Sequence, residues 1–277
     1  VLTLEKMGIP VEYSHHEAAP AQQEIDLRFC DALSAADAVV TARLVIKETA
    51  HAQGMHASFM PKPIEGQPGS AMHVHQSLFD EHGNAFADAN DPDGMGLSSV
   101  AKSYIAGLLK YAPEYMLVTN QYVNSYKRLV PGFDAPVLVS WGSRNRSAMV
   151  RVPRYKPGKP SSTRIAVRSV DSAANPYLAY AAMLGAGLKG VEEGLELCAP
   201  VEENLFKLSP AEIAELGLKY LPRDLSQAID EFEKSELMHE ILGDVICENL
   251  ISAKRAEWEE YRAHVSSWEI DRYLARL

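Results

Sequence analysis

Two histidines on one face of a predicted strand have a spacing that could support chemistry. Residues 69–77 are typical of a strand, in which alternate side chains share a face, so His73, His75 and Ser77 lie together. The preceding loop, residues 60–69, is rich in proline and glycine and cannot be a helix or a central strand. A rigid loop beside two imidazoles can hold a cation and the phosphates bound to it. Taken alone, the pattern is more often a solvated strand face.

Two glutamates are brought together by a predicted pair of strands. Residues 11–17 are typical of one strand, and residues 24–29 alternate strictly between apolar and charged side chains. Because only six residues join them, we expect antiparallel neighbours, with Glu17 ending the first strand and Glu24 beginning the second. The apolar residues expected to face a core are Ile25, Leu27 and Phe29. Without further context, the two carboxylates are most simply solvated acids at strand ends.

Basic side chains gather in one part of a chain that is acidic overall. They are Arg128, Arg144, Arg146, Arg151, Lys156, Lys159, Arg164 and Arg168. Residues 163–168 alternate, which places Arg164 and Arg168 on one strand face. A solvated surface would mix the two signs of charge. Guanidinium groups bind carboxylates and phosphates through paired hydrogen bonds, so the cluster predicts an anion site.

The composition limits the class of protein. The 277 residues are 47% hydrophobic and 23% charged, which is typical of a soluble globular protein of one or two domains. The net charge of -10 argues against nucleic acid as a partner. Three cysteines without a CxxC motif favour a reducing cytoplasm. There is no apolar run of membrane-spanning length and no signal peptide, and the chain starts without Met, so we expect the later part of a longer protein.

The remaining pattern predicts the elements that position these residues. Helices are predicted over residues 34–53, 98–109, 175–190 and 235–265, and a further helix is predicted to start at residue 113. Ser34 would begin the first helix in a capping box. Short strands are expected at 56–60 and 137–141, and polar loops at 79–93 and 124–136. The 175–190 helix is hydrophobic nearly all round, so we expect it to be buried.

Five motifs together resemble one family, type I glutamine synthetase, in its order and at its spacing. They are Lys62-Pro63 with Pro68-Gly69-Ser70-Ala71-Met72-His73 and Ser77, His15-His16-Glu17 through Glu24, Asn124 through Gly132, Arg144-Asn145-Arg146-Ser147, and Ala173 through Tyr177. The resemblance covers essentially the whole chain. It implies an α/β (α+β) fold, with a curved, mostly antiparallel sheet backed by helices and a helical C-terminal region. Residues 1–277 would be the catalytic domain without its upstream strands and its N-terminal β-domain.

The resemblance implies an ATP-dependent ligase that uses two divalent ions, Mg²⁺ or Mn²⁺. ATP would phosphorylate the γ-carboxylate of glutamate, and ammonia would displace the phosphate. Glu17 and Glu24 resemble the ligands of one ion, and His73 resembles a ligand of the second. For the nucleotide, the resemblance implies Glu12, His75, Ser77, Arg146, Arg151 and Arg164. For glutamate it implies Gly69, His73, Arg128 and Arg168. For catalysis it implies Asp134, Arg146 and Arg164. Since alternation puts Glu12 and Glu17 on opposite faces, a bulge or a backbone contact is expected there.

Three positions depart from the family pattern and leave alternatives open. Ala166 replaces a metal-ligating glutamate, Asp134 replaces the catalytic glutamate, and Pro68 replaces an asparagine. The alternatives are a γ-glutamylamide ligase that uses a larger amine or a polyamine, and a non-catalytic member that binds ligand or regulates a partner. The resemblance also implies a homo-oligomer of two stacked hexameric rings. We expect residues 1–277 alone to be inactive as a ligase.

Overall fold

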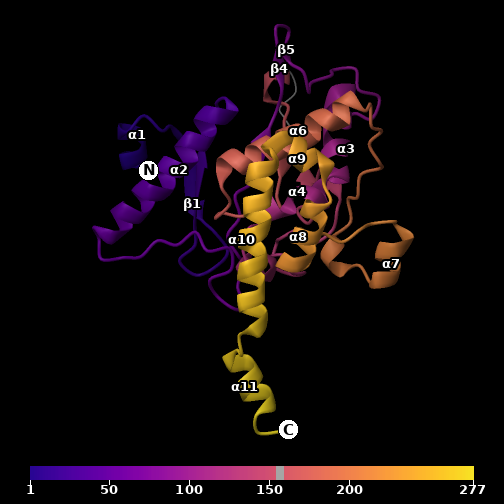
Figure 1. The fold of residues 1–277 in the computed structure, drawn as a ribbon. Coiled ribbons are helices and arrows are strands. Elements are labelled where there is room, and N and C mark those ends of the chain that lie inside the picture. The colour runs from indigo at the N-terminus through magenta and orange to yellow at the C-terminus, as the bar shows by residue number, and fades with distance from the viewer. Residues whose placement is uncertain (154–158) are drawn as a thin grey trace.

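The computed structural model describes residues 1–153 and 159–277 (Figure 1). The first unit contains α1 (Leu2–Lys6), β1 (Val11–His16), β2 (Gln23–Leu27) and α2 (Ala32–His51). The two strands pair antiparallel, as the six-residue connection predicts. Their register shifts between Val11 and Tyr13, so the expected bulge falls at Glu12. Leu4, Ile9, Val11 and Ala42 form a small core beneath this hairpin.

A second, four-stranded sheet has the strand order β3–β8–β7–β6. Its members are β3 (Val74–Gln76), β8 (Ile165–Val167), β7 (Val150–Arg151) and β6 (Trp141–Gly142). The β3–β8 and β8–β7 pairs are antiparallel and the β7–β6 pair is parallel. A two-stranded hairpin, β4 (Phe79–Asp80) with β5 (Gly83–Asn84), lies within the predicted polar loop over residues 79–93. The mixed fold, with mostly antiparallel sheets and many helices, confirms the predicted fold class.

Helices surround the second sheet and hold the main core. The helices before residue 200 are α3 (Ser99–Lys110), α4 (Ala112–Thr119), α5 (Val123–Arg128) and α6 (Pro176–Glu192), and a 3₁₀ turn covers Pro160–Ser162. Ser98 caps α3 and Asn175 caps α6, both as predicted. One side of α6 is fully buried against α3, where three glycines, Gly107, Gly187 and Gly190, allow close approach.

The C-terminal part is helical, as expected. It contains a 3₁₀ turn (Leu205–Lys207), α7 (Pro210–Glu215), α8 (Leu225–Glu233), α9 (Glu236–Leu242), α10 (Asp244–Ala263) and α11 (Ser267–Tyr273). The predicted long helix over 235–265 is interrupted at Gly243, which has a φ of 79°. Figure 1 shows α10 crossing the body and α11 projecting beyond it. Among the described residues, no helix combines the length and apolarity needed to cross a bilayer.

Five local predictions were wrong. Residues 56–60 form no strand, and of residues 137–141 only Trp141 belongs to one. The 124–136 segment is not all loop, because its start is the helix α5. The cap of α2 is Asp31, whose carboxylate accepts from the Ser34 amide at 3.0 Å. Phe29 lies past the end of β2 and is 91% exposed, so it does not face a core.

Candidate active site

The proline- and glycine-rich loop, residues 60–69, is fixed by bonds to α5. The Lys62 amide donates to Asn124 Oδ1 at 2.7 Å, and Asn124 Nδ2 donates back to the Lys62 carbonyl at 3.1 Å. The Ser70 amide closes the loop on the Pro61 carbonyl at 2.8 Å. The Lys62 ammonium also lies 3.7 Å from the centroid of the Phe133 ring, a cation–π distance. These contacts hold the loop against α5 and connect it to the segment that carries Asp134.

Gly69 and Arg128 touch at the end of this loop. A Cβ atom at Gly69 would lie 2.4 Å from the Pro61 carbonyl oxygen and 2.6 Å from Arg128 Cγ, so only glycine fits. Arg128 ends α5 and is buried, with Nε donating to Asp171 Oδ1 at 2.9 Å and a terminal nitrogen donating to the Ser169 carbonyl. Burial raises the pKa of the Asp171 carboxyl, and the charge of Arg128 opposes that change.

Of the predicted strand over residues 69–77, only Val74–Gln76 forms β3, so His75 lies on this strand and His73 lies directly before it. Arginines lie near both rings. His75 pairs with Ala166 of β8, which in turn pairs with Arg151 of β7. Arg164 Nε donates to His75 Nδ1 at 2.9 Å. Protein atoms crowd both rings although each keeps a solvent-exposed edge. This crowding and the neighbouring arginines lower the pKa of His73 to about 3 and of His75 to about 4, so both rings are neutral at neutral pH.

The arginine cluster is concentrated in space as well as in sequence. Arg168 Nε donates to the Arg146 carbonyl at 3.1 Å. Burial and then the charge of Arg151 lower the pKa of Arg168 to about 10, and burial, Arg146 and Arg164 lower that of Arg151. The Nε of Arg151 is buried with no hydrogen-bond partner within the described residues. A bound anion would reduce the repulsion between these arginines and would accept a hydrogen bond from the Nε of Arg151.

The glutamate pair forms a possible cation site with a third member. Ligand atoms of His15, Glu17 and Glu24 lie within 4.8 Å of one another. His15 Nε2 is 3.2 Å from Glu17 Oε1 and 3.8 Å from Glu24 Oε2. Burial and a hydrogen bond to Glu17 raise the pKa of Glu24 to about 7, whereas that bond lowers the pKa of Glu17. Two carboxylates and an imidazole are the oxygen and nitrogen ligands that divalent cations bind, so these residues fit such an ion.

The other predicted residues have more varied positions. Glu12 is the exposed bulge residue of β1, and Ser77 follows β3 directly. Asp134 is exposed, with a φ of 56°, a left-handed conformation that Asp tolerates better than most residues. Of the basic cluster, Arg144 is also exposed, and Lys156 lies outside the described residues.

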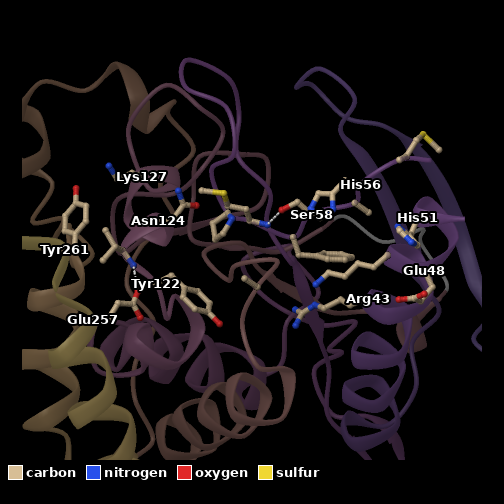
Figure 2. A pocket seen from close by; sticks show the side chains of 18 residues that line it. Arg43, Glu48, His51, His56, Ser58, Tyr122, Asn124, Lys127, Glu257 and Tyr261 are labelled. Carbon is tan, nitrogen blue, oxygen red and sulfur yellow. Dashed lines mark hydrogen bonds between the residues drawn. The ribbon is translucent and has the colours of Figure 1, made fainter. Parts of the chain in front are cut away.

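A cavity of about 850 Å³ lies behind this site rather than in it. Figure 2 shows that its walls come from α2 and the following segment on one side, and from α5 and α10 on the other. Asn124 and Lys127 of α5 line it, whereas the histidines and arginines of the β3–β8–β7 face do not. The cavity is therefore lined by other residues than the candidate site.

Sequence reasoning missed three residues that organise the site. His15 lies two residues before Glu17 on a strand, so alternation alone places it on the same face. Gln22 donates to the Gly69 carbonyl, a contact between distant segments that no local pattern indicates. Asp171 is the buried partner of Arg128 and comes 43 residues later in the chain.

The domain is mixed α/β, and it gathers His15, Glu17 and Glu24 in one group and Arg151, Arg164 and Arg168 in another. The model of one family, "Glutamine synthetase, catalytic domain", matches residues 1–273. The chain belongs to this family.

Relatives and solved structures agree with that assignment. The chain is 54% identical to a glutamine synthetase of Mycolicibacterium smegmatis, 48% to one of Methanosarcina mazei and 46% to one of Thermotoga maritima. These matches cover 98–99% of this chain but only 60–61% of the relatives. A structure titled "Apo GmaS without ligand" has a TM-score of 0.85 at 32% identity, covering 98% of this chain and 60% of that one. A "GmaS/ADP complex" has a TM-score of 0.87 at 31% identity, covering 98% and 61%.

Proposed function

We propose that the protein containing this domain ligates ammonia to the γ-carboxylate of glutamate at the expense of ATP, through a γ-glutamyl phosphate. The observation that carries the proposal is the convergence of Arg151, Arg164 and Arg168 with His73 and His75 on one sheet face. Phosphoryl transfer depends mainly on positioning and on neutralising charge, which such a face supplies. A relative of similar fold carries ADP in its structure title, which supports a nucleotide site.

Divalent cations, Mg²⁺ or Mn²⁺, would be held by few residues of this chain. Glu17 and Glu24, with His15 beside them, would hold one ion, and His73 would contribute to the second. When bound, the ions would neutralise oxygen charge on the phosphates and the attacking carboxylate. Ala166 is a buried member of β8 and supplies no ligand.

Glutamate would lie where Gly69 and Arg128 meet. Arg128 is fixed by Asp171 through Nε, and a carboxylate is the natural partner for its remaining donors. His73, directly before β3, and Arg168, directly after β8, would complete this pocket. Because Gly69 has no side chain, the substrate could approach its backbone directly.

The nucleotide would run along the outer part of the same face. Glu12, His75 and Ser77 would line it, with His75 held by Arg164. Arg146, Arg151 and Arg164 would hold the phosphates, and Arg146 and Arg164 would also stabilise the charge that develops during transfer. Asp134 would accept a proton from ammonium. Its carboxylate lies close enough to Arg168 to oppose, in part, the lowering of the Arg168 pKa.

Two other functions follow from particular residues. The shorter side chain of Asp134 and the loss of an amide donor at Pro68 favour a larger amine and a γ-glutamylamide product. The buried Ala166, which removes one metal ligand, favours a non-catalytic member that binds ligand or regulates a partner.

We also propose the setting in which the domain works. A cytoplasmic homo-oligomer of two stacked hexameric rings would explain the exposed apolar residues of the projecting tail, among them Trp268, Ile270 and Leu274. The partners would then be glutamate, ATP, an amine and further copies of the chain, with no nucleic acid and no membrane.

The test is phosphate release by full-length protein with ATP, Mg²⁺ or Mn²⁺, glutamate and a panel of amines. Ammonia should be the best acceptor. A larger amine that exceeds ammonia in kcat/KM would favour the γ-glutamylamide alternative. No amine-dependent release at all, from protein that still binds ATP, would favour the non-catalytic alternative.

A further inference from the structure

Gln22 connects the turn of the β1–β2 hairpin to the loop that ends at Gly69. Its Nε2 donates to the Gly69 carbonyl at 2.9 Å and contacts Ser70 Oγ at 3.0 Å. Its Oε1 accepts from the Ala19 amide at 3.1 Å. The Gln22 backbone carbonyl accepts from the Glu17 amide at 3.0 Å. One residue therefore bonds to both the carboxylate hairpin and the proposed glutamate pocket.

The orientation of the Gln22 carboxamide is fixed by its partners. The Ala19 amide can only donate and the Gly69 carbonyl can only accept, so the reversed amide would lose both bonds. Gly69 cannot move away from this contact easily, because Pro61 and Arg128 already pack against its Cα. The donor of Gln22 thus sets the direction of the Gly69 carbonyl.

A carbonyl oxygen has two lone pairs, and Gln22 uses one of them. Within residues 1–153 and 159–277, no other protein donor is bonded to the Gly69 oxygen. The remaining lone pair can accept only from a donor, and the only strong donor of glutamate is its α-ammonium group. We propose that Gln22 is a positioning residue that aims the Gly69 carbonyl at the α-ammonium of the substrate. This inference rests on the proposed function.

The same contact joins substrate recognition to the cation site. The Gln22 backbone closes the turn between Glu17 and Glu24, so a shift of the turn would move the carboxamide and with it the Gly69 carbonyl. Filling the cation site should therefore favour the carbonyl direction that glutamate needs. A cation and glutamate should bind cooperatively through this residue.

The experiment uses full-length protein and the variant Gln22→Met, which keeps the length of the side chain but loses its hydrogen bonds. Ser70→Ala is the matched control, since it removes the second Gln22 contact and leaves the Gly69 bond. Glutamate and glutarate, which has a hydrogen in place of the ammonium and so no donor at that carbon, are titrated by calorimetry with and without Mn²⁺. Thermal unfolding checks that each variant is folded.

We expect Gln22→Met to weaken glutamate binding about tenfold, the effect of one lost hydrogen bond to a charged group, and to change glutarate binding less than about twofold. Mn²⁺ should tighten glutamate binding in the parent and in Ser70→Ala, but much less in Gln22→Met. Equal weakening of both ligands would overturn the inference, because a merely structural role predicts it. A parent that binds glutamate but releases no phosphate would count against the proposed function and leave this test intact.

If Gln22→Met does not fold, Gln22→Glu replaces it, since a carboxylate keeps the Ala19 bond and cannot donate to Gly69. The predicted result is then a reduced preference for glutamate over glutarate relative to the parent. An unchanged preference would overturn the inference.

Discussion

Arg128 Nε and Asp171 Oδ1 lie 2.9 Å apart, and their side chains are only 3% and 0% exposed. This buried ion pair joins α5 to the segment that follows β8, at the base of the proposed glutamate pocket. A buried charge without its partner is strongly unfavourable. The pair therefore serves both the stability of the domain and the orientation of Arg128.

The first prediction concerns Asp171→Asn, which leaves Arg128 buried without an anion. We expect the free energy of unfolding to fall by about 3–5 kcal/mol. Denaturant unfolding measures it, with Glu259→Gln as control, because the Arg262–Glu259 pair on α10 is 65% and 59% exposed and should change stability by at most about 0.5 kcal/mol. Equal effects of the two variants would contradict the proposed importance of burial.

The second prediction concerns pH. The folded pKa of Glu24, about 7, lies above its ordinary value of 4.5, so the folded state binds the proton more tightly than the unfolded chain. The contribution of Glu24 to stability therefore falls as pH rises from 4.5 to about 7. The lowered pKa of Glu17 acts in the opposite direction, but only below 4.5.

Thermal unfolding of metal-free protein between these pH values tests this, with Glu24→Gln for comparison. The midpoint of the parent should decline relative to the variant as pH rises, and Mn²⁺ should remove the decline, because the cation replaces the proton. Parallel curves for the parent and the variant would show that Glu24 does not titrate in this window.

The third prediction tests the departure at Ala166, which is 1% exposed between His75 and Arg151 in the sheet. Ala166→Glu should restore a ligand near His73 and tighten the weaker Mn²⁺ site. Since losing even an outer partner costs about tenfold in metal affinity, we expect at least that gain. Ala166→Gln is the neutral control. A calorimetric titration with unchanged affinity would mean that the site has changed in other ways or that the loss is already compensated.

The fourth prediction concerns the contact between α3 and α6. A Cβ atom at Gly107 would lie 2.3 Å from the Ala186 carbonyl oxygen and 2.8 Å from Gly190 Cα. Because both are backbone atoms, Gly107→Ala should lower stability by about 3 kcal/mol. Gly185→Ala should cost less, since the nearest atoms to its Cβ all belong to the Ile241 side chain and not to the backbone. Thermal unfolding should therefore give Gly107→Ala the lower midpoint, and a lower midpoint for Gly185→Ala would contradict the prediction.

The sequence was most informative where local patterns act. Alternation and a short connection predicted the β1–β2 pair, and the conflict between Glu12 and Glu17 predicted the bulge that the register contains. Periodicity failed at residues 56–60, where the backbone is held by tertiary contact instead: Ser172 Oγ donates to the Phe59 carbonyl at 2.8 Å. It failed again at α5, whose first turn is closed by Ser125 Oγ accepting from the Tyr122 amide.

Site residues divide in the same way. Short-range patterns indicated the histidines and the acid pair, and an excess of one sign of charge over residues 128–168 indicated the arginines. Asp171 and Gln22 act on partners that are 43 and 47 residues away, and a single sequence carries no signal for such contacts. His15 was within reach of the same alternation that we applied to His73 and His75.

The most direct test of the proposed chemistry follows an oxygen atom. Full-length protein is given ATP, Mn²⁺, ammonia and glutamate labelled with ¹⁸O in its γ-carboxylate, and the released phosphate is analysed by mass spectrometry. If the carboxylate attacks the γ-phosphorus of ATP and ammonia then displaces the phosphate, one labelled oxygen must move from glutamate to each phosphate that accompanies an amide. Glutamine formed together with unlabelled phosphate, or labelled glutamate returned without any ATP-dependent amide, would contradict a ligase that works through γ-glutamyl phosphate.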